Sequence, residues 1–154
     1  MKENYDVVFC ILTYKNEQDL IELLKSIYEK CFFKFKCIVV NSHYDDCTSK
    51  KIKTVADANN CVFIDVPNKG YGAGNNRAIE FAFDAYQFEY LVVCNPDTII
   101  KAFDLQHLKK YNDRCCIYAP KVVCASGKKQ NPLMAKENRF ADRMIYKGYL
   151  NNNK

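Results

Sequence analysis

The sequence predicts an α/β protein with a mainly parallel sheet and helices on both faces. Apolar runs of strand length alternate along the chain with longer segments whose apolar residues recur at helical spacing. The 154 residues suffice for one domain with a substantial core, and the hydrophobic fraction of 49% is ordinary for a globular protein. We expect the strand–helix–strand crossovers to be right-handed.

The first two elements are a strand and a helix. Residues 5–13, YDVVFCILT, form a nearly continuous apolar run with β-branched residues, which is typical of a strand buried on both faces. In residues 16–29, leucines and an isoleucine recur at three- and four-residue spacing, which predicts an apolar helical stripe.

The same order continues to residue 94. We predict strands over 35–40, 61–66 and 90–94, with helices over 45–58 and 75–86 between them. Beyond residue 97 the pattern is weaker.

There, residues 103–111 are expected to form a helix and residues 115–119, CCIYA, a strand that ends before Pro120.

The positive charge is concentrated at the C-terminal end. The net charge is +5, yet the first 124 residues hold 16 basic and 16 acidic side chains, and residues 125–154 hold seven basic and two acidic ones. We therefore divide the chain into a main domain, 1–124, and a basic tail, 125–154. Within the tail, residues 134–147 predict a basic amphipathic helix, which either packs on other protein or lies on an anionic membrane surface.

Composition excludes several classes of protein. The nine cysteines show neither CxxC nor zinc-ribbon spacing, and several lie inside apolar runs, so we expect reduced thiols. No stretch of 18 apolar residues is present, and the N-terminus, MKENYD, does not resemble a signal peptide. We expect a cytoplasmic protein, with contact to the inner face of the membrane left open. Without tryptophan or basic–aromatic interleaving, a nucleic-acid partner is not expected.

Polar segments follow four of the predicted strands: residues 13–16, 41–46, 68–75 and 95–98. Ligands of open parallel sheets bind at the carboxyl ends of strands, so these segments should converge on one edge.

The segment 68–77, NKGYGAGNNR, holds three of the five glycines. It matches neither the P-loop pattern nor the dinucleotide fingerprint. The glycines permit close approach of a ligand and a sharp turn into the helix expected from Asn75, and a helix-entry turn without a ligand is the alternative.

Residues 95–97, Asn-Pro-Asp, place a carboxylate directly after a buried strand. Asp97 is suited to a divalent cation such as Mg²⁺ or Mn²⁺ that bridges diphosphate oxygens. In isolation, such a sequence is also typical of a plain turn.

Four blocks carry a family resemblance: ILTYKNEQDLIELLKSI, IVVNSHYDDCT, NKGYGAGNNRAIEFA and YLVVCNPDTII. In this order they resemble glycosyltransferase family 2, inverting enzymes of the GT-A fold, and especially its rhamnosyltransferase-like members. The resemblance covers about residues 5–130 and corresponds to the N-terminal, donor-binding part. It implies transfer of a sugar from a nucleoside diphosphate, most simply a dTDP- or UDP-sugar, to a saccharide or lipid-linked acceptor in surface polysaccharide synthesis.

The resemblance also implies a role for individual residues. Asp97 falls on the metal-binding position, for Mg²⁺ or Mn²⁺. The implied nucleotide-sugar-binding residues are Thr13, Tyr14, Asn41, Asp46, Asn68, Gly70, Gly74, Asn75 and Asn95.

Three positions depart from the family pattern. Asn41 replaces an aspartate that recognises the base, Lys15 replaces an asparagine, and Arg77 replaces a small residue. Lys15 and Arg77 either contact the diphosphate or are solvated.

The catalytic base is not identified. Family members are longer, and their second half supplies the acceptor site and a carboxylate base, which nothing after Gln130 matches. Glu137 and Asp142 fit polar helix positions better, and His43 and His107 are expected to be a loop and a surface-helix histidine.

We therefore expect an apparently truncated chain, a split-gene product or a short homologue. The alternative function is a catalytically incomplete nucleotide-sugar-binding remnant, or a subunit that needs a partner chain or a homo-oligomer. An unrelated doubly wound nucleotide-binding regulator is a third interpretation.

Overall fold

A computed structural model describes residues 2–110, 117–124 and 126. The chain divides into two compact units, residues 1–110 and 111–154, and all helices and strands assigned in the described residues lie in the first unit. Residue 126 apart, the expected basic tail lies outside the described residues, and so does its amphipathic helix.

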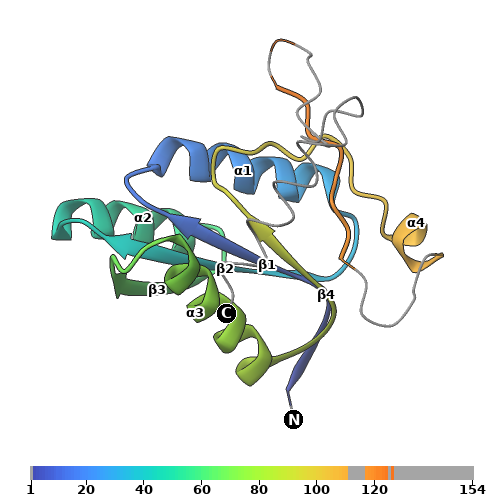
Figure 1. Cartoon of the computed structure of the whole chain (residues 1–154), viewed down its shortest axis with the longest axis horizontal. Helices are drawn as coiled ribbons and strands as arrows, with labels where there is room; N and C mark the ends of the chain where they lie inside the picture. The colour runs from blue at the N-terminus through green and yellow to red at the C-terminus, as the bar shows by residue number, and fades with distance from the viewer. Residues whose placement is uncertain (1, 111–116, 125, 127–154) are drawn as a thin grey trace, which may run out of the picture. The chain divides into compact units, whose positions relative to one another are not determined.

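The first unit is built on a parallel sheet (Figure 1). Its strands run in the spatial order β3-β2-β1-β4, and each neighbouring pair is parallel. The strands are β1 (Glu3–Thr13), β2 (Phe35–His43), β3 (Val62–Pro67) and β4 (Tyr86–Cys94). The chain therefore moves outward from β1 to β3 and then returns across the sheet to place β4 on the other side of β1.

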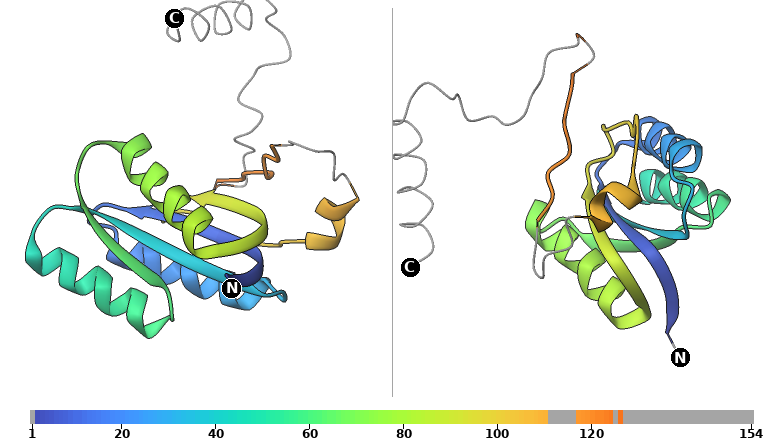
Figure 2. Two further views of the ribbon diagram at one scale, coloured as in Figure 1. Left: turned by 90° about the horizontal axis from the view of Figure 1, so that it is seen from below. Right: turned by 90° about the vertical axis from the view of Figure 1, so that its right-hand side faces the viewer.

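Helices cover both faces of the sheet. Helices α1 (Glu17–Lys30) and α2 (Asp46–Ala58) pack on one face, and α3 (Tyr71–Ala85) packs on the other (Figure 2). A short helix, α4 (Leu105–Lys109), follows β4. The predicted fold class, α/β with a mainly parallel sheet and helices on both faces, is confirmed.

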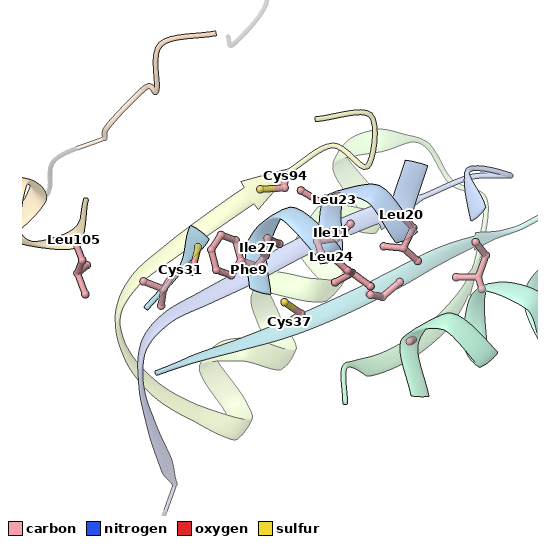
Figure 3. Packing of buried hydrophobic residues seen from close by; sticks show 14 residues of the cluster. Phe9, Ile11, Leu20, Leu23, Leu24, Ile27, Cys31, Cys37, Cys94 and Leu105 are labelled. Atoms are coloured by element: carbon pink, nitrogen blue, oxygen red, sulfur yellow. The ribbon is translucent and has the colours of Figure 1, made fainter. Parts of the chain in front are cut away.

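Strand β1 is buried on both faces because its side chains alternate between two apolar clusters. Phe9 and Ile11 pack with the α1 stripe that contains Leu23 and Leu24, in the cluster drawn in Figure 3. Cys10 belongs to the opposite cluster, under α3. Each fully buried leucine or phenylalanine stabilises the fold by about 1.5–3 kcal/mol. Because β1 contributes side chains to both clusters, it is the centre of the unit.

The structure corrects two element boundaries. Helix α3 begins at Tyr71, four residues before its expected start, because Gly70 at the N-cap turns the chain with a φ of +93°. β4 begins at Tyr86, directly after α3 ends, whereas the sequence predicted a strand from residue 90.

The elements after residue 97 are shorter than predicted. Helix α4 begins after Asp104, whose carboxylate accepts a hydrogen bond from the backbone N–H of His107 at 2.9 Å. Of the strand predicted over 115–119, residues 115 and 116 lie outside the described residues, and residues 117–119 form no strand.

Candidate functional site

An open pocket of about 340 Å³ lies at the carboxyl ends of the strands. The loops after β1 and β4 flank the point where the strand order reverses, which is the usual ligand position in doubly wound sheets. The pocket is lined by Leu12, Thr13, Tyr14, Asn16, Ser42, Asn68, Gly70, Tyr71, Asn95, Pro96 and Asp97. The polar segments predicted to converge therefore do meet at this edge.

The loop after β4 contributes a carboxylate held on a stiff turn. The backbone carbonyl of Asn95 accepts hydrogen bonds from the hydroxyl of Thr98 at 2.6 Å and from its N–H at 3.3 Å. Pro96 is buried, whereas Asp97 is exposed. This turn presents the Asp97 carboxylate to the pocket and keeps its backbone in place.

Tyr71 links the glycine segment to the loop after β4. Its hydroxyl donates a hydrogen bond to the side-chain oxygen of Asn95 at 2.9 Å. Asn68 closes the turn into the helix, since its side-chain oxygen accepts a hydrogen bond from the N–H of Gly70 at 3.2 Å. No side chain of residues 2–110 caps α3, so within this part of the chain the first N–H groups of the helix have no capping partner.

Gly74 and Asn75 lie inside α3 and do not line the pocket. A Cβ at Gly74 would lie 2.3 Å from Cδ1 of Leu12, so glycine at this position lets α3 approach β1 closely. The side-chain nitrogen of buried Asn75 donates to the carbonyl of Tyr71 at 3.0 Å, while its side-chain oxygen is buried without a hydrogen-bond partner.

Asn41 does not face the pocket either. It is 0% exposed, and both ends of its amide are engaged. The oxygen accepts a hydrogen bond from the hydroxyl of Thr13 at 3.2 Å, and the nitrogen donates to Asp65 at 2.8 Å. In this arrangement Asn41 joins β1 to β3 through one side-chain N–H and its side-chain oxygen.

Asp65 is the centre of a polar network that sequence analysis missed. Besides Asn41, its carboxylate accepts hydrogen bonds from Ser49 on α2 and from Nδ1 of His43, each at 2.8 Å. A charged carboxylate has no proton to donate, so Nδ1 of His43 must carry one. A single acid inside the apolar run CVFIDV was the available signal, because a carboxylate there needs partners.

The network shifts the ionisation of its members. Burial is the largest influence on Asp65 and raises its pKa, but the hydrogen bonds from His43, Asn41 and Ser49 together outweigh it, so the pKa lies below the ordinary value. The hydrogen bond to Asp65 raises the pKa of His43, against a smaller opposing effect of burial. His43 therefore ends β2 and is paired with Asp65, whereas the sequence predicted a loop histidine.

The remaining predicted positions lie outside the pocket lining. Asp46 begins α2, its side chain is 90% exposed, and its carboxylate lies 3.8 Å from Nε2 of His43. Arg77 pairs with Glu80 at 3.5 Å on the exposed surface of α3. Lys15, by contrast, lies against two tyrosines beside the pocket.

A divalent cation fits the pocket only together with a ligand that supplies oxygens. Among the described residues no group of three or more histidine, cysteine, aspartate or glutamate side chains could hold a metal. Within the described part of the chain, Asp97 is the single carboxylate in the pocket lining. Mg²⁺ and its relatives are often held by one or two carboxylates plus substrate phosphates, and this lining suits that mode.

The sequence profile of Glycosyl transferase family 2 matches residues 8–152. The chain belongs to this family.

A curated relative supports the same assignment. The low-salt glycan biosynthesis hexosyltransferase Agl10 of Haloferax volcanii is 29% identical over 104 residues, which are 67% of this chain and 31% of that protein.

Solved structures share the fold. The mannosyltransferase PcManGT of Pyrobaculum calidifontis, in complex with GDP-Man and Mn²⁺, is similar at a TM-score of 0.55 and 21% identity, over 72% of this chain and 33% of that one. TarS 1-349 of S. aureus, in complex with UDP-GlcNAc, is similar at 0.51 and 22%, over 69% and 30%. The GT-A-like fold is confirmed, and this chain spans about a third of the length of the relatives it matches.

No helix among the described residues is long and apolar enough to cross a membrane. The cysteines within them, Cys10, Cys31, Cys37, Cys47, Cys61, Cys94 and Cys124, are free thiols.

Proposed function

We propose that this chain binds the nucleoside-diphosphate part of a sugar donor and forms the donor-binding part of an inverting glycosyltransferase of glycan biosynthesis. The position and lining of the pocket carry the proposal: it lies at the carboxyl ends of β1 and β4, in a chain that belongs to Glycosyl transferase family 2. The ligands named for two similar structures, GDP-Man with Mn²⁺ and UDP-GlcNAc, support a nucleotide sugar and a divalent cation.

Several residues of the pocket suit this ligand. Tyr14 is 42% exposed and offers an aromatic face on which a nucleobase can stack. The uncapped N–H groups at the start of α3, next to Gly70, can donate hydrogen bonds to sugar or phosphate oxygens. Tyr71 holds Asn95 in place by a hydrogen bond. The exposed Asp97 belongs to the pocket lining, where it can contact a cation.

Asp97 is the residue that would hold the cation, together with the diphosphate. When bound, the cation would offset the negative charge that develops on the departing nucleoside diphosphate. We propose a dTDP- or UDP-sugar as the donor and a saccharide or lipid-linked molecule as the acceptor.

One observation favours a second function, donor binding without transfer by this chain alone. Inverting transfer needs a carboxylate within hydrogen-bond reach of the acceptor hydroxyl, in addition to a metal ligand. Asp97 is the only carboxylate that lines the pocket, so the described residues supply no base there. Release of nucleoside diphosphate from UDP- and dTDP-sugars, with and without saccharide acceptors, separates the two functions.

Nucleotide binding is the direct test. The purified chain would be titrated with UDP, dTDP and GDP by calorimetry, with and without Mn²⁺. We expect binding of a pyrimidine diphosphate that requires Mn²⁺ and weakens at least about tenfold in Asp97→Asn, because a charge-assisted contact is lost.

Asp84→Asn is the matched control, since Asp84 is an exposed aspartate within α3 and not in the pocket lining. It should bind like the unchanged chain. Absence of nucleotide binding by the unchanged chain, under either metal condition, would contradict the proposed function.

A further inference from the structure

Lys15 has a backbone conformation that costs stability. Its φ is +62°, in the left-handed region where L side chains crowd the following carbonyl. Asn60 is the other described residue besides glycine with positive φ, and asparagine tolerates this region well. Residues held in such conformations gather at ligand-binding sites, where the surrounding structure compensates their strain.

The side chain of Lys15 rests on aromatic rings. Its Nζ lies 3.1 Å from the ring centroid of Tyr44 and 5.2 Å from that of Tyr14. The two rings meet edge to face, with centroids 6.0 Å apart, and Tyr44 is 54% exposed. An ammonium over a ring face is attracted by the ring quadrupole, but at an exposed site this attraction is weak.

Lys15 is also placed to supply positive charge to the pocket. Its chain neighbours Tyr14 and Asn16 both line the pocket, whereas the part of the lining that the described residues form contains Asp97 and no basic side chain. A diphosphate carries more negative charge than one cation held on one aspartate neutralises. No ion pair engages Lys15 within the described residues, whereas Arg77 already pairs with Glu80.

We propose that Lys15 is a diphosphate-binding residue with two positions: its ammonium lies on Tyr44 in the empty site and on the diphosphate when a nucleotide is bound. The inference rests on the proposed function. Rotation of the lysine side chain is sufficient to move the ammonium from Tyr44 to the diphosphate, because the backbone of Lys15 already lies between two residues that line the pocket. Tyr44 then competes with the ligand for the ammonium and lowers the affinity for nucleotide.

The first test compares UDP with uridine, which lacks phosphates, in the presence of Mn²⁺. Lys15→Gln should weaken UDP binding about tenfold, because a charge-assisted hydrogen bond is lost, and should leave uridine binding unchanged. Lys51→Gln is the charge-matched control: Lys51 lies on α2, 3.9 Å from Glu17, and is not in the pocket lining. It should bind both ligands like the unchanged chain.

A glycine variant separates binding from folding. Lys15→Gly removes the charge and relieves the left-handed strain, so it should raise the melting temperature while UDP binding still weakens about tenfold. A loss of UDP affinity accompanied by an equal loss for uridine would overturn the proposal, because the effect would then be structural.

The second test removes the competing ring. Tyr44→Leu should bind UDP about two- to fivefold more tightly, the gain expected when an exposed cation–π contact no longer competes. Tyr44→Phe keeps the ring and should match the unchanged chain. By NMR, the side-chain methylene protons of Lys15 should be shifted upfield by the Tyr44 ring, and UDP should reverse that shift.

These outcomes distinguish the two proposals. If the unchanged chain binds no nucleotide, the proposed function fails. If it binds UDP and Lys15→Gln binds UDP equally well, or if UDP leaves the Lys15 proton shifts unchanged, the role of Lys15 alone is refuted.

Discussion

Replacement of Asp65 by alanine tests the polar network that joins β2, β3 and α2. The change leaves the side-chain nitrogen of Asn41, which is 0% exposed in the unchanged chain, without its acceptor. An unsatisfied buried donor of this kind costs about 1–3 kcal/mol. Ser49 and His43 also lose a bond, but both reach solvent and can rebind water.

We therefore expect Asp65→Ala to lower the free energy of unfolding by about 2–3 kcal/mol. For a chain of this length the melting temperature should fall by about 5–10 °C. Urea unfolding followed by circular dichroism measures the first quantity, and a thermal scan the second. Asp57→Ala is the control, because Asp57 pairs with Lys53 at 2.6 Å with both side chains more than half exposed, and such pairs contribute about 0–1 kcal/mol.

A double-mutant cycle isolates the buried bond. Asn41→Ala removes the donor that Asp65→Ala leaves unpaired, so the double variant should lose less stability than the sum of the single ones, by about 1–2 kcal/mol. The reasoning is refuted if Asp65→Ala costs no more than Asp57→Ala, or if the two network variants are strictly additive.

Three further outcomes are expected. The pKa of His43 is raised in the folded state, so the pairing of His43 with Asp65 stabilises the fold below the unfolded histidine pKa, and this stability is lost as the pH rises through the folded pKa. His43→Gln should remove this decline in the free energy of unfolding at higher pH. His107→Gln, the control, should keep the decline. Gly74→Ala should destabilise the fold by about 1–2 kcal/mol, because the added methyl group forces Leu12 aside. In a urea titration, Leu12→Ala in the same chain should cancel part of that cost. A Gly74→Ala variant that is more stable than the unchanged chain would contradict the close packing. Cys47 is exposed, so Cys47→Ser should remove one rapidly labelled thiol in a kinetic assay, whereas Cys10→Ser should leave the fast phase intact, because burial raises the pKa of Cys10 to about 12.

At acid pH the free energy of unfolding should change with pH in the opposite direction. The folded-state pKa of Asp65 is lowered, so its hydrogen bonds contribute stability above the unfolded aspartate pKa and lose it as the pH falls through the folded pKa.

The order of strands and helices, their parallel sheet and the edge where polar segments gather were all predictable from the amino-acid sequence. Apolar periodicity carries this information because each element must bury a stripe or a face, as the two faces of β1 do. The residues directly after β1 and β4, such as Tyr14 and Asp97, were found for the same reason: the end of an apolar run marks the end of a strand.

Which polar side chains reach the pocket was not predictable in this way, because it depends on how distant segments pack. Asn41 and Asp65 lie 24 positions apart in the sequence but side by side in the register of β2 and β3, where a hydrogen bond joins their side chains. The early start of α3 moved Gly74 from a pocket wall into a helix contact with Leu12. Such pairings depend on strand register and helix rotation, which arise from packing between distant segments and leave no periodic trace in the chain.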